Sequence, residues 1–394
     1  FIDSSLGFAC GSSGTVLKTI DGGNIWTNIS IPTTVSVNDI AFVGYMGHGW
    51  AAVGNTFFPS DSSGQIWHTT NGGASWTRQT IDSSATRNCI SFISATTGWV
   101  GGTGVPGMTL DVDYTTNGGS SYTKQTNANL FIWLSNINAV SDSIVYAVGN
   151  TLWVPAGAYL MKTTNGGKTW IDLNAGVIPF ASDINFVNPT NGYVVGDTGF
   201  VSATTDGGAS WKTQTSGTHN PLRSVSFVST SVGWTCGDSG AIVRTLDSGN
   251  TWLNDSSYTK KRLRGIYAIK SAGWATGDSG TTVWAVGDSG TILKRTTVPV
   301  GITEKPPVKW LSAYPNPSHE YTSIVITTPH NLSEDALKVY DVLGRDVTNK
   351  VSVQLIQTGE VARFDITFNL DKGVYSFIVT AHEALVTNGR LLVN

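Results

Sequence analysis

Residues 69–76 read Thr-Thr-Asn-Gly-Gly-Ala-Ser-Trp, and this box decides the fold because the chain repeats it. The general form is Thr-x-Asp/Asn-Gly-Gly-x-x-Trp, and its acid or amide recurs at steps of 50, 46, 48, 41 and 41 residues. The five further copies span 19–26, 115–122, 163–170, 204–211 and 245–252. Periods of about 40 to 50 residues that contain several short strands indicate the blades of a β-propeller.

Each repeat carries signals for four antiparallel strands. An alternating apolar segment comes first, as at 183–187, and a Gly-Trp/Tyr-x-x-Gly segment follows, as at 192–196. A third strand runs into the box, and the aromatic residue that closes the box opens a fourth strand, as at 76–80. Four short strands joined by tight turns are typical of one propeller blade.

The residue types of the box predict a structural turn. We expect the Asp or Asn to accept hydrogen bonds from amides two residues on, the Gly pair to supply positive φ, and the Trp to pack between adjacent sheets. Three of the six boxes have Asn in place of Asp, at Asn71, Asn117 and Asn165. Since an amide would not freely replace a catalytic acid or a metal ligand, these exchanges favour a purely structural role.

Composition supports a β-rich globular protein. The 394 residues include 45 Gly and 14 Trp, only 13% are charged and 40% are apolar, which excludes a helical bundle and a disordered chain. The net charge of −3 offers no basic field, so we expect no nucleic-acid partner. No run of eighteen apolar residues predicts a membrane helix. Cys10, Cys89 and Cys236 fit no zinc spacing, and we expect them in the core.

A change in composition divides the chain. Residues 1–303 contain no Glu and 41 of the 45 Gly, whereas 304–394 contain five Glu and four Gly. We therefore predict a seven-bladed propeller over 1–297, a Pro-bearing linker over 298–311, and a small β-sandwich over 312–394.

The two ends of the predicted ring are irregular. The seventh unit lacks a box and contains a near-duplication, in which residues 273–282 resemble 283–292. Phe1 corresponds to the end of a first strand, so we expect the gene product to contain residues before it.

The boxes resemble the Asp-box (BNR) repeats of sialidases, sortilin-type receptors and the photosystem II assembly factor of plants and cyanobacteria. The resemblance covers about residues 1–297 and is most specific to the assembly factor at 233–252. It implies a β-propeller fold and assigns no activity.

Three repeats are longer than the others, with the extra residues at 55–60, 103–108 and 150–155. These insertions lie between the second and third strands, on the face opposite the boxes. Exposed aromatics and prolines there would suit a glycan or a protein partner. The alternative is that the loops fold onto one another and cover the blade ends. The candidate ligand-binding residues are Phe57, Phe58, Met108 and Trp153.

Three ordered motifs in the last domain resemble the type A C-terminal sorting domain of the type IX secretion system. They are Tyr-Pro-Asn-Pro at 314–317, Leu-Lys-Val-Tyr-Asp-Val-Leu-Gly-Arg at 337–345, and Leu-Asp-Lys-Gly-Val-Tyr at 370–375. The corresponding sorting-signal residues are Tyr314, Pro315, Asn316, Pro317, Asp341, Gly344, Arg345, Gly373, Tyr375 and Arg390, the last in place of the family's usual Lys.

The resemblance to sorting domains implies a route and a location. It implies a Bacteroidota-type envelope, handling by the type IX translocon and its outer-membrane shuttle, and a secreted or cell-surface protein. In the family the sorting domain is usually removed, with attachment to lipopolysaccharide or release.

The same sequence weighs against the enzymes that carry such boxes. Sialidases need a Tyr–Glu pair, and the first Glu here is Glu304. Xyloglucanase-type glycosidases use two Asp between two propellers and need about twice this length. Asp111 and Asp113, beside an inserted loop, are the pair we would test as acid and base or nucleophile. We predict no metal and no cofactor.

The predicted function is therefore a secreted or cell-surface binding or adhesion module. It would recognise a glycan or a protein, or serve in a surface assembly. The alternative is a glycoside hydrolase or lyase with an Asp-based site.

Overall fold

The computed structural model describes the chain except for a set of segments and single residues. These are 45–46, 55–63, 82–85, 105–108, 126–132, 152–156, 174–178, 256, 258, 271–280, 297–308, 315–320, 328–331, 334–335, 341–345, 359–360, 369–372, 382–383 and 394. Among the described residues, no helix is long and apolar enough to cross a membrane.

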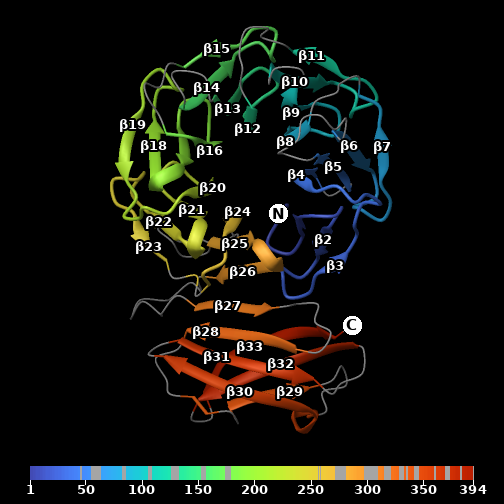
Figure 1. Cartoon of the computed structure of the whole chain (residues 1–394), viewed down its shortest axis with the longest axis vertical. Helices are drawn as coiled ribbons and strands as arrows, with labels where there is room; N and C mark the ends of the chain where they lie inside the picture. The colour runs from blue at the N-terminus through green and yellow to red at the C-terminus, as the bar shows by residue number, and fades with distance from the viewer. Residues whose placement is uncertain are drawn as a thin grey trace.

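Seven antiparallel blades surround a central axis, which confirms the predicted propeller (Figure 1). Blade 1 has three described strands, β1 (Gly7–Cys10), β2 (Val16–Thr19) and β3 (Thr27–Asn28). Blades 2 and 3 comprise β4 (Val37–Val43), β5 (His48–Val53), β6 (Gln65–Thr69), β7 (Thr77–Gln79), β8 (Thr86–Phe92), β9 (Gly98–Gly104), β10 (Thr109–Thr115) and β11 (Thr123–Gln125).

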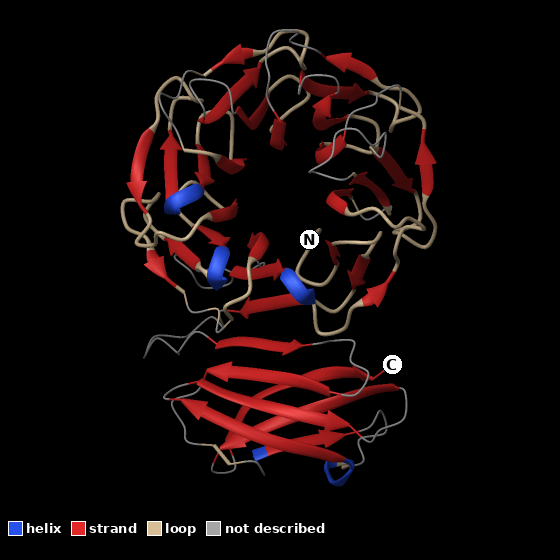
Figure 2. Cartoon of the chain, in the orientation of Figure 1, coloured by secondary structure: helices blue, strands red, loops and turns tan. Residues whose placement is uncertain are grey.

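Blades 4 to 6 repeat the same order of four strands from the axis outward. They comprise β12 (Trp133–Ala139), β13 (Val145–Thr151), β14 (Gly157–Thr163), β15 (Ile171–Asp172), β16 (Ala181–Phe186), β17 (Gly192–Gly196), β18 (Phe200–Thr204), β19 (Lys212–Thr215), β20 (Leu222–Phe227), β21 (Gly233–Gly237), β22 (Ile242–Thr245) and β23 (Leu253–Asn254). Figure 2 shows single 3₁₀ turns between the second and third strands of blades 5 to 7, η1 (Asp197–Gly199), η2 (Asp238–Gly240) and η3 (Asp288–Gly290).

Blade 7 leads into the last domain through a shared strand. Its strands are β24 (Leu263–Lys270), β25 (Thr281–Gly287) and β26 (Thr291–Thr296), and β27 (Lys309–Tyr314) pairs with β26 on one side and β28 (Tyr321–Thr327) on the other. The predicted linker, residues 298–311, thus ends in a strand, because its last three residues pair with β26.

The last domain consists of two sheets. The first continues from β27 and β28 through β31 (Val361–Phe368) to β30 (Val351–Thr358), and the second contains β29 (Leu337–Tyr340), β32 (Gly373–Ala381) and β33 (Ala384–Val393). Side chains from both sheets, including Val339, Phe364 and Phe377, form one buried core.

The six boxes form turns between the third and fourth strands, and we call this side of the ring the box face. The Gly pairs have positive φ, as predicted. The expected amide contact is wrong in one respect. The side-chain Oδ1 of Asn71 accepts a hydrogen bond from the amide of Ser75, which is four residues on rather than two. The contact over two residues involves Thr69, whose hydroxyl accepts from the amide of Asn71. This hydroxyl, rather than the side chain of Asn71, is thus the acceptor for the amide two residues on, and it donates to Asn71 Oδ1 at 2.8 Å.

Adjacent blades interlock through aromatic pairs. Trp50 on β5 stacks on Phe92 of the next blade with ring centroids 3.7 Å apart, and Tyr193 stacks on Phe227 at 3.5 Å. The ring closes in the same way, because Trp284 of blade 7 stacks on Phe1 at 3.5 Å. Phe1 thus takes the position of a first-strand Phe, as the repeat predicts.

The innermost strand of each blade is the edge strand of its sheet. Some of its backbone amides donate hydrogen bonds to side chains of the preceding blade. The amide of Ile90 donates to Asp39 at 2.9 Å, and that of Val225 donates to Asp183 at 2.8 Å. Burial raises the pKa of Asp39 to about 7 and that of Asp183 to about 6, although these amide hydrogen bonds act in the opposite direction. These contacts tie neighbouring blades together at the axis.

Candidate functional site

The four ligand-binding candidates from the inserted loops, Phe57, Phe58, Met108 and Trp153, lie outside the described residues. They stay a prediction. In blades 5 to 7 the connection between the second and third strands contains the turns η1 to η3, and we call the side of the ring that carries these turns the turn face.

The Asp pair lies inside blade 3 and forms a buried ion cluster. Asp111 and Asp113 point from β10 toward Arg87 on β8, and Gly102 of the intervening β9 pairs with both Arg87 and Asp111. Arg87 Nη1 lies 3.3 Å from Asp111, Nη2 lies 2.8 Å from Asp113, and Lys124 contacts Asp111 at 3.0 Å. A Cβ at position 102 would overlap the carbonyl oxygen of Thr86 on β8, so the close approach of β9 to β8 beside this cluster requires glycine.

Burial governs what this cluster can do. The Asp111 and Asp113 side chains are only 1% and 4% exposed. Burial raises the pKa of Asp113 to about 6, while the Arg87 guanidinium opposes that rise. A polysaccharide could not reach either carboxylate in this conformation, so the arrangement is suited to fixing the strands of blade 3.

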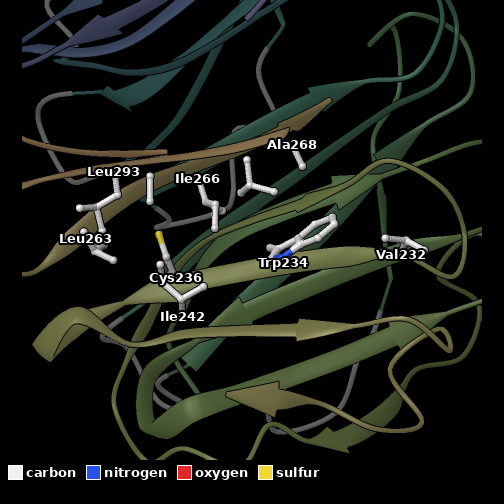
Figure 3. Packing of buried hydrophobic residues seen from close by; sticks show 10 residues of the cluster. Val232, Trp234, Cys236, Ile242, Leu263, Ile266, Ala268 and Leu293 are labelled. Carbon is white, nitrogen blue, oxygen red and sulfur yellow. The ribbon is translucent and has the colours of Figure 1, made fainter. Parts of the chain in front are cut away.

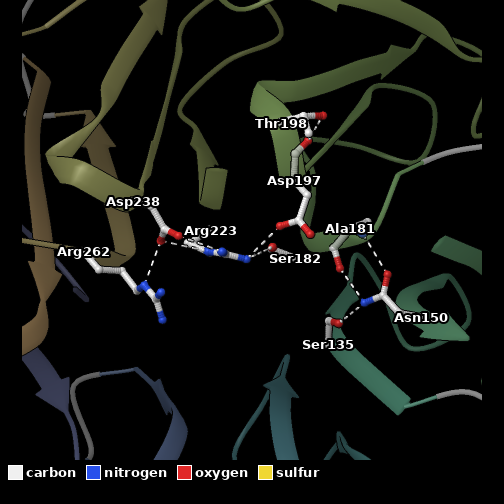
Figure 4. A network of polar contacts seen from close by, with 9 residues as sticks. All are labelled: Ser135, Asn150, Ala181, Ser182, Asp197, Thr198, Arg223, Asp238 and Arg262. Atoms are coloured by element: carbon white, nitrogen blue, oxygen red, sulfur yellow. Dashed lines mark hydrogen bonds and ion pairs between the residues drawn. The ribbon is translucent and has the colours of Figure 1, made fainter. Parts of the chain in front are cut away.

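A second charged network lies on the turn face, where the innermost strands of blades 6 and 7 begin (Figure 4). Arg223, at the start of β20, binds Asp238 with two hydrogen bonds of 3.0 and 2.8 Å and reaches Asp197 of blade 5 at 3.1 Å. Arg262 contacts the same Asp238 at 2.8 Å. The hydrogen bonds from Arg223 hold the pKa of Asp238 below its ordinary value.

The segments at 196–199, 237–240 and 287–290 share the form Gly-Asp-x-Gly, and this repetition by itself accounts for their Asp residues as turn residues and gives no sign of ionic partners. The structure places Asp197 and Asp238 within reach of arginines that begin the inner strands of blades 6 and 7, and Arg264 likewise contacts Asp288. The signal available in the sequence was the run Lys-Lys-Arg-Leu-Arg at 260–264, which concentrates four cations in a chain of low charge.

These cations remain accessible after the ion pairs form. Lys260 and Lys261 are exposed, and the side chains of Arg262 and Arg264 are 43% and 62% exposed. Together with Arg223, this part of the rim carries five cations and the three carboxylates of Asp197, Asp238 and Asp288. This part of the rim is therefore locally positive although the whole chain has a net charge of −3.

An aromatic pair adjoins the charged network. Trp133 of blade 4 and Phe180 of blade 5 are both partly exposed, and their rings are parallel within 1° with centroids 5.9 Å apart. The carbonyl of Phe180 accepts a hydrogen bond from the amide of Asp197, which joins this pair to the first carboxylate of the network. We call the aromatic pair, the network and residues 260–264 the inner rim. It combines apolar rings with accessible positive charge.

The described part of the chain holds no group of three His, Cys, Asp or Glu side chains placed to bind a metal ion. Among the predicted sorting residues, Tyr314 lies on β27, Gly373 and Tyr375 lie on β32, and Arg390 lies on β33. Arg390 pairs with Ser376, directly after Tyr375, so two of the motifs meet on neighbouring strands. The residues Pro315, Asn316, Pro317, Asp341, Gly344 and Arg345 lie outside the described segments.

The fold and the C-terminal domain together define an exported Asp-box propeller. Residues 170–265 match the family described as photosynthesis system II assembly factor YCF48, and residues 312–394 match the secretion system C-terminal sorting domain. The protein is thus an all-β seven-bladed propeller of YCF48-like repeats fused to a type IX sorting domain, which places it at the cell surface or outside the cell.

Solved structures agree on the fold. YCF48 bound to D1 peptide is 17% identical with a TM-score of 0.58, over 75% of this chain and 90% of that one. YCF48 from Cyanidioschyzon merolae is 16% identical with a TM-score of 0.56, over 75% and 92%. An ancestral GH74 enzyme is 15% identical with a TM-score of 0.55, over 99% of this chain but only 60% of its own. No curated protein matches the sequence.

Proposed function

We propose that the exported propeller binds an acidic, partly apolar segment of a partner protein at the inner rim. The observation that carries this proposal is that one rim of the turn face bears both the aromatic pair, in blades 4 and 5, and the accessible positive charge of residues 260–264, which lead into blade 7. Exposed cations and aromatic rings on one rim favour a ligand that offers carboxylates and apolar side chains together.

The rim geometry supports an extended ligand rather than a compact one. The aromatic pair belongs to blades 4 and 5, the network joins blades 5 and 6, and the basic run leads into blade 7. A peptide lying across four blades could contact rings at one end and cations at the other. A solved propeller of this fold, YCF48, is bound to a D1 peptide, which supports peptide binding as a use of the scaffold.

We infer the finer steps of export from the sorting domain alone. These are a Bacteroidota-type envelope, recognition by the translocon and its outer-membrane shuttle, and attachment to lipopolysaccharide after removal of the domain. In that setting the binding module would act in adhesion or in a surface assembly. Mass spectrometry of the native surface protein tests these steps, since a lipid-linked product and a free one differ in mass.

Binding is tested by fluorescence anisotropy with two labelled decapeptides, one of alternating Glu and Phe and one of alternating Lys and Phe. We expect the full chain to bind the first and not the second. The double variant Lys260→Glu, Lys261→Glu should weaken binding at least about tenfold, or about 1.4 kcal/mol.

The matched control is Lys168→Glu, which reverses an exposed cation on the box face. It should leave the affinity unchanged, because position 168 lies at the opposite ends of the strands from the inner rim. Equal loss in both variants, or equal binding of both peptides, would contradict the proposed site. Binding of neutral oligosaccharides that is unaffected by the charge reversals would instead favour a glycan ligand.

A further inference from the structure

The strand β27 changes its partner between Leu311 and Ser312. Lys309, Trp310 and Leu311 pair with Thr296, Arg295 and Lys294 of β26, whereas Ser312, Ala313 and Tyr314 pair with β28. The first half of this strand is therefore the fourth strand of blade 7, and the second half is the first strand of the sandwich.

The register of blade 7 shows which residue replaces the missing box. In blades with a box, one residue of the third strand lies opposite the aromatic residue of the second strand. On its other side, that third-strand residue pairs with the fourth-strand residue that directly follows the box Trp. Thus Lys162, opposite Tyr146, pairs with Ile171, and Arg244, opposite Trp234, pairs with Leu253. The box residues Trp170 and Trp252 come immediately before these partners.

Blade 7 repeats this register without a box. Lys294 lies opposite Trp284 and pairs with Leu311, and the residue before Leu311 is Trp310. Trp310 thus holds the register position of a box Trp. The three residues that pair with β26 also match the length of the other outer strands, which have two to four residues.

We propose that Lys309, Trp310 and Leu311 belong to the propeller, and that any proteolytic cut that frees a complete propeller lies at or after the Leu311–Ser312 bond. Such a cut is a hydrolysis by a peptidase, in which water adds across one amide bond to give a new carboxylate on the propeller and a new amine on the sorting domain. A cut upstream would leave the outer edge of β26 unpaired. The match to the sorting-domain family begins at residue 312, in agreement with this boundary.

The strand assignment is tested in the full chain by hydrogen exchange. The triple variant Lys309→Gly, Trp310→Ser, Leu311→Gly should speed exchange of the β26 amides at Lys294 to Thr296 at least about tenfold, because their outer neighbour is lost. The control Glu304→Gly, Lys305→Ser, Pro306→Gly makes the same change within the predicted linker and should leave these amides unchanged. Unchanged exchange in the first variant would overturn the assignment.

The boundary is tested on the exported protein itself. The C-terminal residue of the form isolated from the cell surface or medium is identified by mass spectrometry. A last residue at or beyond Leu311, up to Asn394, is the expected result. A folded propeller whose last residue precedes Lys309 would overturn the proposal, and this outcome is independent of ligand binding at the inner rim.

Discussion

The ring of Phe42 lies directly over Gly49, its partner in the neighbouring strand, so that a Cβ at position 49 would overlap the ring. The same relation recurs in blades 3, 5 and 6, between Phe92 and Gly98, Phe186 and Gly192, and Phe227 and Gly233. The Gly of each Gly-Trp/Tyr motif is thus required by a ring in its own blade, while the aromatic residue after it packs on the next blade.

Gly49→Ala should therefore destabilise the propeller. The added methyl forces Phe42 out of its position, and overpacking of this kind costs about 1–3 kcal/mol. Gly11→Ala is the matched control, because a Cβ there would meet no atom closer than 4.0 Å. Chemical denaturation should show the loss for position 49 and a change within about 0.5 kcal/mol for position 11. A similar loss at both positions would mean that the ring contact is not the cause.

Blades 4 and 7 solve the same packing problem with different residues. Ala139 pairs with Val145, and Ala268 pairs with Val283, in place of Phe and Gly. Figure 3 shows Ala268 in the core cluster that also contains Trp234 of the preceding blade. A small residue on the first strand thus accompanies a larger one on the second, which keeps the local volume filled.

Because Ala139 and Val145 replace the Phe and Gly pair of the other blades, we expect the effects of substitutions at these two positions on stability to be strongly coupled. Ala139→Phe should destabilise by overpacking against Val145, and Val145→Gly should destabilise by leaving a cavity. The double variant recreates the Phe and Gly pair of the other blades, so its loss should be smaller than the sum of the single losses by about 0.5–3 kcal/mol. Strict additivity in a denaturation cycle would refute the pairing.

The sequence was sufficient for the seven blades and the box turns, because both rest on local patterns that repeat. It was insufficient for contacts that join repeats. The ion pair between Arg223 and Asp197 links residues of two blades, and nothing near either residue marks the other. The role of Lys309–Leu311 was missed for a related reason, since its strand partner precedes it across the undescribed segment 297–308 and the box that normally marks the fourth strand is absent.

The inner-strand carboxylates predict a dependence of stability on pH. Burial raises the pKa of Asp39 to about 7, above its ordinary value near 3.9 in an unfolded chain. Between about pH 4 and 7 the folded protein binds the extra proton, so the contribution of this group to the free energy of unfolding falls as pH rises. In Asp39→Asn this fall should be smaller, by about 2–3 kcal/mol between pH 5 and 8, since the folded and unfolded forms differ in protonation over about two pH units of that range.

Asn cannot accept both amide hydrogen bonds that Asp39 accepts from Ile40 and Ile90, so the substitution also changes the absolute stability. The test therefore compares the slope of stability against pH, not the absolute stability. Asp142→Asn, at an exposed position, is the control and should run parallel to the wild type. Thermal unfolding across this pH range measures the slopes. Parallel profiles for the wild type and Asp39→Asn would show that Asp39 does not titrate as proposed.

If the buried ion cluster in blade 3 has a structural role, loss of one of its members should destabilise the protein. Arg87→Leu removes the guanidinium that both Asp111 and Asp113 contact, and removal of one member of a buried ion cluster costs about 3–5 kcal/mol. Arg264→Leu breaks the exposed pair with Asp288 and should cost below about 1 kcal/mol. Denaturation of both variants measures the difference, and equal losses would contradict the burial argument.

The same pair tests the hydrolase alternative. Asp111→Asn with Asp113→Asn should lower stability, since the amides cannot replace the charges that Arg87 and Lys124 face. Hydrolysis of a polysaccharide panel by the wild type, lost in a double variant that still folds, would support an Asp-based enzyme instead.

The proposed peptide binding predicts a marked dependence on salt. Lys260 and Lys261 are exposed, as are Arg262 and Arg264, so their attraction for an acidic segment acts largely through water. The screening length falls from about 30 to about 10 Å between 0.01 and 0.1 M salt. Affinity for the peptide of alternating Glu and Phe should therefore drop over this range, mainly through a slower association rate.

The Lys260→Glu, Lys261→Glu variant should show a weaker salt dependence, and Lys168→Glu an unchanged one. An affinity that is independent of salt would assign the binding to the aromatic pair alone, because apolar contacts with Trp133 and Phe180 are not screened by ions.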